Sequence, residues 1–317
     1  MKLCAVFSLR FLWLPLLGCL MSMTVHAQSK AVDEITVGMS IPSLQWVFYL
    51  MVRDGVMEQA KNLGIKNVLV ADAQADPARQ VSQIQDMLSK KIDVLLYTAT
   101  GSAASAVPVR LAKQQGVPVI CIDNFPKNVE CDAYVSTDNL AAAGELARQM
   151  IQLTGGKAEI GLLQGTLGDS TEVARAKGLD AVLSEVPEMK IVDHKPTDWL
   201  QENGFKVAQD MLQKNPNINV FIGRSDAPAL GAAQAVKVAN IDHKVWVFGY
   251  DGLPSALEAI RDGKMDMTIT QQAVEMGRTA LRTAVDLQQG KQVTKTQLLP
   301  AFVTTRENAA TFLEKHP

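Results

Sequence analysis

Polar, acidic, amide and aromatic side chains recur just after the short apolar segments of this 317-residue chain. Carboxylates and amides exchange hydrogen bonds with hydroxyl groups, and flat aromatic rings cover C–H faces, so these groups suit a small polyhydroxylated ligand. The chain is only 5% aromatic, yet several of its aromatic residues occupy these positions. The candidate ligand-binding residues are Gln45, Trp46, Phe48, Tyr49, Asp123, Asn124, Glu172, Trp199, Ser225, Asp251 and Gln271.

The residue types that catalysis requires do not form a recognisable motif. The histidines beyond residue 27 are His194, His243 and His316, and no two of them have metal-ligand spacing. The sequence has no Gly-x-Ser-x-Gly nucleophile elbow and no Walker-type phosphate loop. We therefore expect a protein that is not an enzyme and that holds no cofactor and no metal. An exported α/β enzyme is the weaker alternative.

The apolar segments alternate with segments of helical character. Expected strands are 35–39, 68–71, 94–97, 117–122, 159–163, 190–194, 220–222 and 245–250, and expected helices are 47–63, 77–90, 104–115, 171–184, 201–214, 228–238 and 254–262. Continuous apolar strands are typical of parallel sheets that are covered on both faces. Two such arrays fit the length better than one sheet of ten strands. The sequence therefore predicts an α/β fold of two Rossmann-like lobes, with ligand beyond the carboxyl ends of the strands.

The overall composition narrows the possible partners. The chain has 31 Lys+Arg against 33 Asp+Glu, a net charge of −2, so a broadly basic surface for nucleic acid is excluded. Its four cysteines are too few for a disulfide scaffold. These numbers describe an ordinary globular protein.

The N-terminal segment has the pattern of a secretory leader. Residues 1–27 combine Lys2 and Arg10 with an apolar run and the small residues Val25 and Ala27 before a cleavage site. We expect cleavage after Ala27 and a periplasmic location. Lipidation at Cys19, in Leu-Leu-Gly-Cys, is the alternative.

Two cysteines lie beyond the leader, at Cys121 and Cys131. In an oxidising compartment they could pair, or they could remain two unpaired thiols, because spacing does not reveal geometry.

An ordered set of short motifs extends from Ile35 to Thr305. The set comprises Arg53-Asp-Gly55, Gln80-x-x-Gln83-Ile84-Gln85, Pro118 to Asp123, Ser136-Thr-Asp-Asn139, Arg175-Ala-Lys-Gly178, Asn215-Pro216, Ser225-Asp226, Phe248-Gly-Tyr-Asp-Gly252 and Ile269-Thr-Gln271. Together they resemble the periplasmic sugar-binding proteins of the ribose-binding type, which share their fold with the ligand-binding part of LacI-type repressors. The resemblance implies a type I periplasmic binding protein, in which two lobes joined by three hinge crossings close on a sugar.

The resemblance also implies domain limits and residue roles. The crossings would fall near 137–138, 271–272 and 300–301. They would give an N-terminal lobe of residues 33–137 plus 272–300 and a C-terminal lobe of residues 138–271 plus 301–317. The residues that match the family's ligand contacts are Phe48, Tyr49, Asp123, Trp199, Asp251 and Gln271.

Departures from the family pattern leave the ligand open. Asn124 stands where ribose-type proteins have an arginine, a second ligand arginine matches Glu172 or Val173, and Ser225 replaces an asparagine. The guanidinium group of an arginine donates several hydrogen bonds to a bound sugar. Because both of these arginines are absent, we expect a sugar or sugar alcohol other than ribose. A furanoside signal, or an amine held by Asp123, Asp251 and Glu172, is the alternative. The implied partners are an ABC transporter permease, or a chemoreceptor, for a protein expected to be a monomer.

Overall fold

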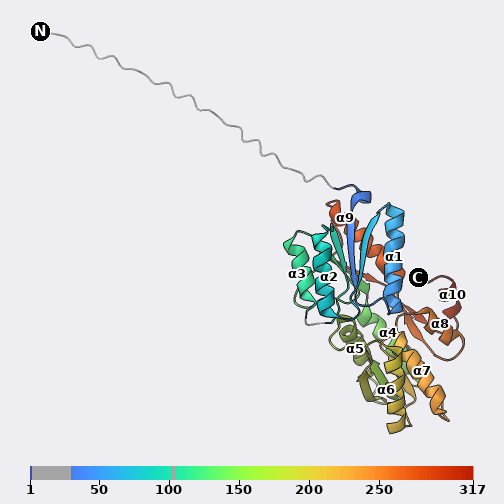
Figure 1. The fold of residues 1–317 in the computed structure, drawn as a ribbon. Helices are drawn as coiled ribbons and strands as arrows, with labels where there is room; N and C mark the ends of the chain where they lie inside the picture. The colour runs from blue at the N-terminus through green and yellow to red at the C-terminus, as the bar shows by residue number, and fades with distance from the viewer. Residues whose placement is uncertain (2–29, 102–103, 317) are drawn as a thin grey trace.

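The computed structural model describes Met1, residues 30–101 and residues 104–316, and the described chain forms two α/β lobes (Figure 1). The expected leader, its cleavage site and Cys19 lie outside the described residues, apart from Met1. A short 3-10 helix, Val32–Glu34, precedes the first strand.

The first lobe is built on a six-stranded parallel sheet with the order β11-β5-β4-β3-β1-β2. Its strands are β1 (Thr36–Ile41), β2 (Asn67–Asp72), β3 (Val94–Tyr97), β4 (Val119–Ile122), β5 (Ala133–Thr137) and β11 (Thr296–Leu299). Helices α1 (Val47–Leu63) and α9 (Ala273–Gln288) cover one face, and α2 (Pro77–Ser89) and α3 (Ala106–Gln114) cover the other. Burial on both faces explains why the strands are continuous apolar runs.

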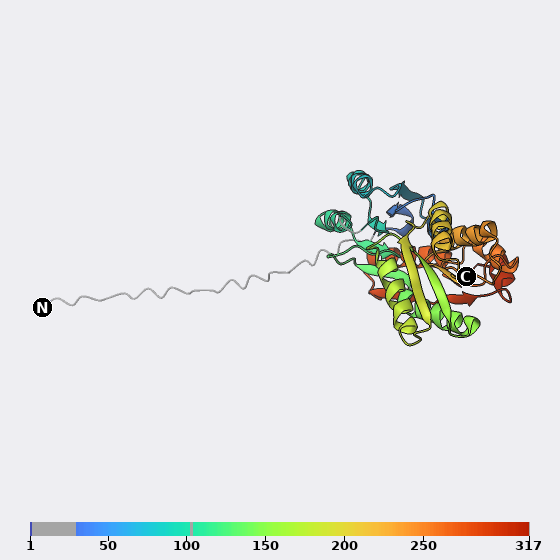
Figure 2. The ribbon, with the colours of Figure 1, turned by 90° about the horizontal axis from the view of Figure 1, so that it is seen from below.

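The second lobe contains a four-stranded parallel sheet with the order β7-β6-β8-β9, and Figure 2 brings this lobe to the front. Its elements are α4 (Asn139–Thr154), β6 (Ala158–Gln164), α5 (Ser170–Leu183), β7 (Met189–Pro196), α6 (Gln201–Lys214), β8 (Val220–Gly223), α7 (Asp226–Ala239), β9 (Trp246–Phe248), α8 (Pro254–Arg261) and α10 (Ala309–Glu314). Two isolated parallel bridges, Phe248 to Met267 and Asp251 to Thr270, connect the end of this sheet to the antiparallel pair β10 (Thr268–Thr270) and β12 (Phe302–Thr304).

The chain passes between the two lobes three times: between β5 and β6, between β10 and β11, and between β11 and β12. This connectivity is the expected two-lobe α/β architecture with three crossings. Strand β5 and helices α4 and α9 lie in segments that are not among the expected strands and helices. The exact lobe limits stay a prediction.

Glycines allow helices α1 and α9 to pack closely on each other. A Cβ atom on Gly55 of α1 would lie 2.0 Å from the carbonyl oxygen of Val274, and one on Gly277 of α9 would lie 2.0 Å from that of Val52. The glycine of each helix therefore lies against the backbone of the other helix, and α1 packs closely on α9. The N-terminus of α1 carries aromatic residues that reach the space between the lobes.

Candidate functional site

The carboxyl ends of the strands from both lobes enclose a cleft of ≈ 230 Å³. Eight of the candidate residues line it, namely Gln45, Trp46, Phe48, Tyr49, Asp123, Trp199, Ser225 and Asp251. Sequence reasoning did not identify its other lining residues as candidates, and these are Val47, Thr171, Arg175, Leu200, Gln201, Ala227, Leu230, Leu253 and Ser255. The cleft is smaller than the range of about 300–1,000 Å³ typical of drug-sized ligands, and it fits a molecule of monosaccharide size.

Asp123 follows β4 and supplies the carboxylate of the first lobe. Its Oδ2 accepts a hydrogen bond of 2.9 Å from the Tyr49 hydroxyl, and its Oδ1 has no partner among the described residues. Burial raises the pKa of Asp123 to about 6, against the opposing influence of Arg175 and of the Tyr49 hydrogen bond. Burial and the neighbouring Asp123 together raise the pKa of Tyr49 well above its usual value. A ligand hydroxyl could satisfy the open oxygen of Asp123.

Asp251 follows β9 and supplies the carboxylate of the second lobe. Its Oδ2 accepts a hydrogen bond of 2.8 Å from the Ser225 hydroxyl, and its Oδ1 accepts one of 2.8 Å from Gln271 Nε2. Burial raises the pKa of Asp251, and Arg175 opposes this shift. Gln271 is fully buried and does not line the cleft, so in this structure it orients Asp251.

Arg175 of α5 lies beside Asp251, with 3.4 Å between Nη1 and Oδ1. Its guanidinium carbon lies 3.8 Å from the centroid of the Tyr250 ring, and its Nε donates a 2.8 Å hydrogen bond to Asn139 Oδ1. Burial lowers the pKa of Arg175, but Asp251 and the other nearby acidic groups outweigh burial and raise it overall. Positions 124, 172 and 173 hold no arginine, but Arg175 brings a guanidinium to the cleft from another position of α5. Its motif, Arg175-Ala-Lys-Gly178, contributed to the family resemblance, but a position inside a helix did not indicate a ligand contact.

Asn124 and Glu172 are candidate residues that do not line this cleft. Asn124 Oδ1 accepts hydrogen bonds from the amide and hydroxyl of Ser170, at 2.8 and 2.9 Å, so it connects the two lobes. Glu172 Oε1 lies 3.0 Å from Arg224 Nη1, and its Oε2 accepts a bond from the Gly165 amide. The Glu172 carboxylate is thus already paired within the second lobe.

Trp199 provides an aromatic wall of the cleft. Its φ of 64° lies in the left-handed region, and its Nε1 donates a 3.2 Å hydrogen bond to Asp169 Oδ2. The ring lies so close to Gly165 that a Cβ there would be 2.0 Å from it, which leaves glycine as the residue that fits. On the opposite lobe, Phe48 packs edge-on against Tyr49 with 5.4 Å between ring centroids.

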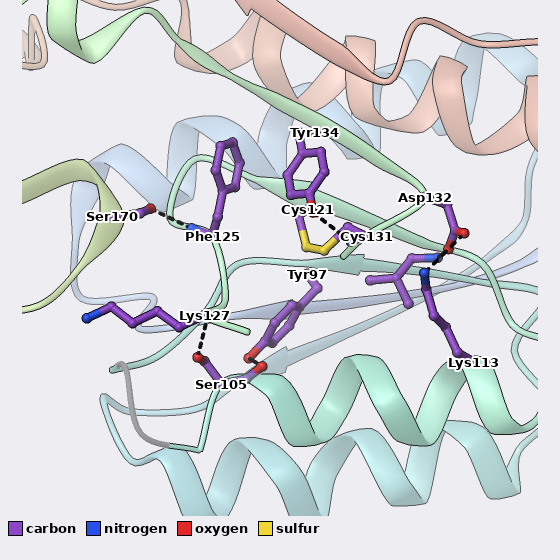
Figure 3. The surroundings of a disulfide bond; sticks show 11 residues. Tyr97, Ser105, Lys113, Cys121, Phe125, Lys127, Cys131, Asp132, Tyr134 and Ser170 are labelled. Atoms are coloured by element: carbon purple, nitrogen blue, oxygen red, sulfur yellow. Dashed lines mark hydrogen bonds and ion pairs between the residues drawn. A yellow bond between two sulfur atoms is a disulfide. The ribbon is translucent and has the colours of Figure 1, made fainter. Parts of the chain in front are cut away.

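A disulfide joins Cys121 of β4 to Cys131, whose Cα atoms lie 5.9 Å apart (Figure 3). Of the two alternatives that the sequence left open, the structure therefore contains the paired cysteines. The Cys131 amide donates a 2.8 Å hydrogen bond to the Tyr134 hydroxyl, which ties the same loop to β5. Asp123 lies two residues after Cys121, so this bond stabilises the strand end that carries it.

Within residues 30–101 and 104–316, no group of three or more His, Cys, Asp or Glu residues is arranged to hold a metal ion. The helices of the same residues include none that is both long and apolar enough to cross a membrane.

Comparisons with known proteins agree on one family. Residues 37–292 match the model of the periplasmic binding protein domain. The ribose import binding protein of Bacillus subtilis is 32% identical over 275 residues, covering 86% of this chain and 88% of that protein. The D-allose-binding periplasmic protein of Escherichia coli is 28% identical over 296 residues, covering 90% and 94%.

Solved structures show the same likeness. The Caulobacter myo-inositol binding protein, bound to myo-inositol, has a TM-score of 0.82 at 28% identity, covering 87% of this chain and 95% of that one. A periplasmic solute-binding protein of an ABC transporter from Actinobacillus succinogenes, with bound D-allose, has a TM-score of 0.81 at 26% identity, covering 88% and 100%.

Proposed function

This chain belongs to the periplasmic binding protein family, and from that premise we propose that it captures a small sugar or sugar alcohol between its lobes and delivers it to an ABC transporter permease. The observation that carries the proposal is the pair of buried carboxylates, Asp123 from one lobe and Asp251 from the other, in a single small cleft. A ligand whose hydroxyls contact both carboxylates would join the lobes.

The charges of the cleft favour a neutral ligand. Arg175 offsets the charge of Asp251, and because its guanidinium lines the cleft it would repel the ammonium group of an amine. The guanidinium edge of Arg175 also offers donors for hydroxyl oxygens. Arg175 is therefore added to the proposed ligand-binding residues. Asn124, Glu172 and Gln271 are proposed to act through their neighbours.

The proposed mechanism is hinge closure at crossings near 137–138, 271–272 and 300–301. A ligand that contacts both lobes binds the closed form better and shifts the population toward it. Small-angle scattering should show a smaller radius of gyration with saturating ligand than without it. An unchanged radius would contradict closure.

The closed receptor would then dock on the permease, after export to the periplasm and cleavage of the leader after Ala27. Mass spectrometry of the exported protein tests the cleavage and distinguishes it from lipidation at Cys19.

A chemoreceptor is the alternative partner. Loss of ligand uptake in a deletion strain, with chemotaxis retained, would favour transport. Sedimentation of the purified protein tests the proposed monomer.

The ligand is tested on residues 28–317 by thermal shift and calorimetry with D-ribose, D-allose, D-xylose, myo-inositol and small amines. A ligand present at 100 times its Kd stabilises the folded state by about 2.7 kcal/mol, which raises the melting temperature by several degrees. The bound sugar should be recovered unchanged, because we propose no enzymatic activity. If no sugar raises the melting temperature and an amine does, the sugar assignment is wrong.

Asp251→Asn serves as the site variant, and Asp242→Asn, on the exposed surface, is its matched control. A hydrogen bond to a charged group contributes about 1.5–3 kcal/mol, so we expect affinity to fall by roughly 10- to 150-fold in the first variant. The control should bind as the unmodified protein does. If both variants bind the ligand with equal affinity, Asp251 is not a ligand-binding residue.

A further inference from the structure

A second chamber adjoins the cleft and opens from the same wall. It has a volume of ≈ 400 Å³ and shares Gln45, Trp46, Tyr49 and Leu200 with the cleft. Its remaining wall comes from both lobes, including Pro42 and Thr100 of the first and Thr166 and Asp198 of the second. It lies toward β1, β2 and β3, and thus away from the sheet edge at β5 and β11 where the chain crosses between lobes.

The chamber persists although the lobes already touch beside it. Asn124, which lines the chamber, accepts two hydrogen bonds from Ser170 across the lobe boundary. The amide of Phe125 donates a third, of 2.7 Å, to the Ser170 hydroxyl. The lobes are therefore in contact beside the chamber, so the chamber is not simply a gap between separated lobes.

The walls of the chamber combine apolar surface with several polar groups, and its described lining residues carry no cation. Ser43, Gln74, Thr100, Thr166, Asp169 and Asp198 supply hydroxyl, amide and carboxyl groups, and none of the described lining residues is Lys or Arg. Asp169 Oδ1 and Thr100 Oγ1 are buried without a hydrogen-bond partner among the described residues. Buried polar atoms of this kind are normally satisfied by a ligand or water. The carboxyl groups would repel a phosphate or carboxylate.

We propose that the ligand is longer than one sugar ring and is an uncharged disaccharide or glycoside. One ring occupies the cleft between Asp123 and Asp251, and the second unit occupies the chamber, where Trp46 and Leu200 form the passage between them. This inference rests on the proposed function, because it assigns the ligand class of the same site.

The test compares disaccharides with their own component sugars by calorimetry on residues 28–317. The probes are maltose, cellobiose, lactose and melibiose against D-glucose and D-galactose. At least one disaccharide should bind at least about tenfold more tightly than either component, a difference of about 1.4 kcal/mol.

Thr166→Trp fills the chamber from one lobe, and Leu167→Trp is its matched control, because Leu167 is 60% exposed and does not line the chamber. Thr166→Trp should weaken the disaccharide by at least about tenfold and leave monosaccharide affinity within about twofold, while Leu167→Trp changes neither. Ala75→Trp, which enters from the other lobe, replaces Thr166→Trp if that variant does not fold.

The outcomes separate this inference from the proposed function. If monosaccharides bind and no disaccharide binds more tightly, the inference fails and the proposed function stands. The inference also fails if the chamber-filling variants bind the disaccharide unchanged. If no sugar or polyol binds at all, the proposed function fails and the inference fails with it.

Discussion

Removing the disulfide should lower the stability of the first lobe by a predictable amount. The perturbation is the double substitution Cys121→Ala and Cys131→Ala. The bond closes a loop of sequence separation 10, for which the loop-entropy expression gives about 3 kcal/mol at 25 °C. A loss of this size lowers the melting temperature of a lobe by roughly 6–12 °C, at roughly 2–4 °C per kcal/mol.

The assay is thermal unfolding of three samples: the oxidised protein, the protein in dithiothreitol, and the double variant. Reduction keeps both cysteine side chains, so it separates the loss of the covalent bond from the loss of buried sulfur. The reduced protein should melt well below the oxidised protein, and dithiothreitol should not affect the double variant. Two free thiols in the oxidised native protein, or equal melting temperatures, would refute this reasoning.

Three further perturbations test the cleft, its titration and the helix packing. Arg175→Lys should weaken sugar binding by about tenfold or more in calorimetry, because lysine lacks the planar group that lies over Tyr250. The melting temperature of the ligand-free protein should fall between about pH 4 and pH 7. Burial raises the pKa of Asp226 to about 7, so the folded state binds its proton more tightly than the unfolded state, whose pKa is about 4, and stability is lost as pH rises through that window. Asp226→Asn should reduce this slope, and a flat profile in the unmodified protein would contradict the assignment. Gly55→Ala should cost about 1–3 kcal/mol in urea unfolding, whereas Gly144→Ala, whose Cβ would have its nearest neighbour at 3.4 Å, should be tolerated.

Local pattern was enough to identify several elements. The expected helices 47–63 and 201–214 and the expected strand 94–97 coincide with α1, α6 and β3. Gly64, which ends α1 with a φ of 74°, is a stop that the sequence shows directly. The rule that ligands lie beyond parallel strands also led to Asp123 and Asp251, because the end of an apolar run can be read from the sequence.

Two helices of the structure were not among the expected elements. Helix α4 is rich in alanine and small residues, whereas α9 has a clear apolar face, with Met276, Ala280 and Leu281 buried, that the sequence reasoning overlooked. Both are held by tertiary packing, α4 on α5 and α9 on α1, which the sequence does not display.

The sequence by itself determined the two-lobe α/β architecture and the carboxylates at its strand ends, because hydrophobic burial and strand length are properties of local segments. Only the tertiary structure decided the pairing of Cys121 with Cys131 and the roles of Arg175, Asn124 and Gln271. These depend on distances between segments far apart in the chain, such as the 3.4 Å between Arg175 and Asp251. Such distances arise from the packing of whole lobes. The partner of a side chain across the cleft is determined by how the segments pack in three dimensions, and its neighbours in the sequence do not reveal that packing.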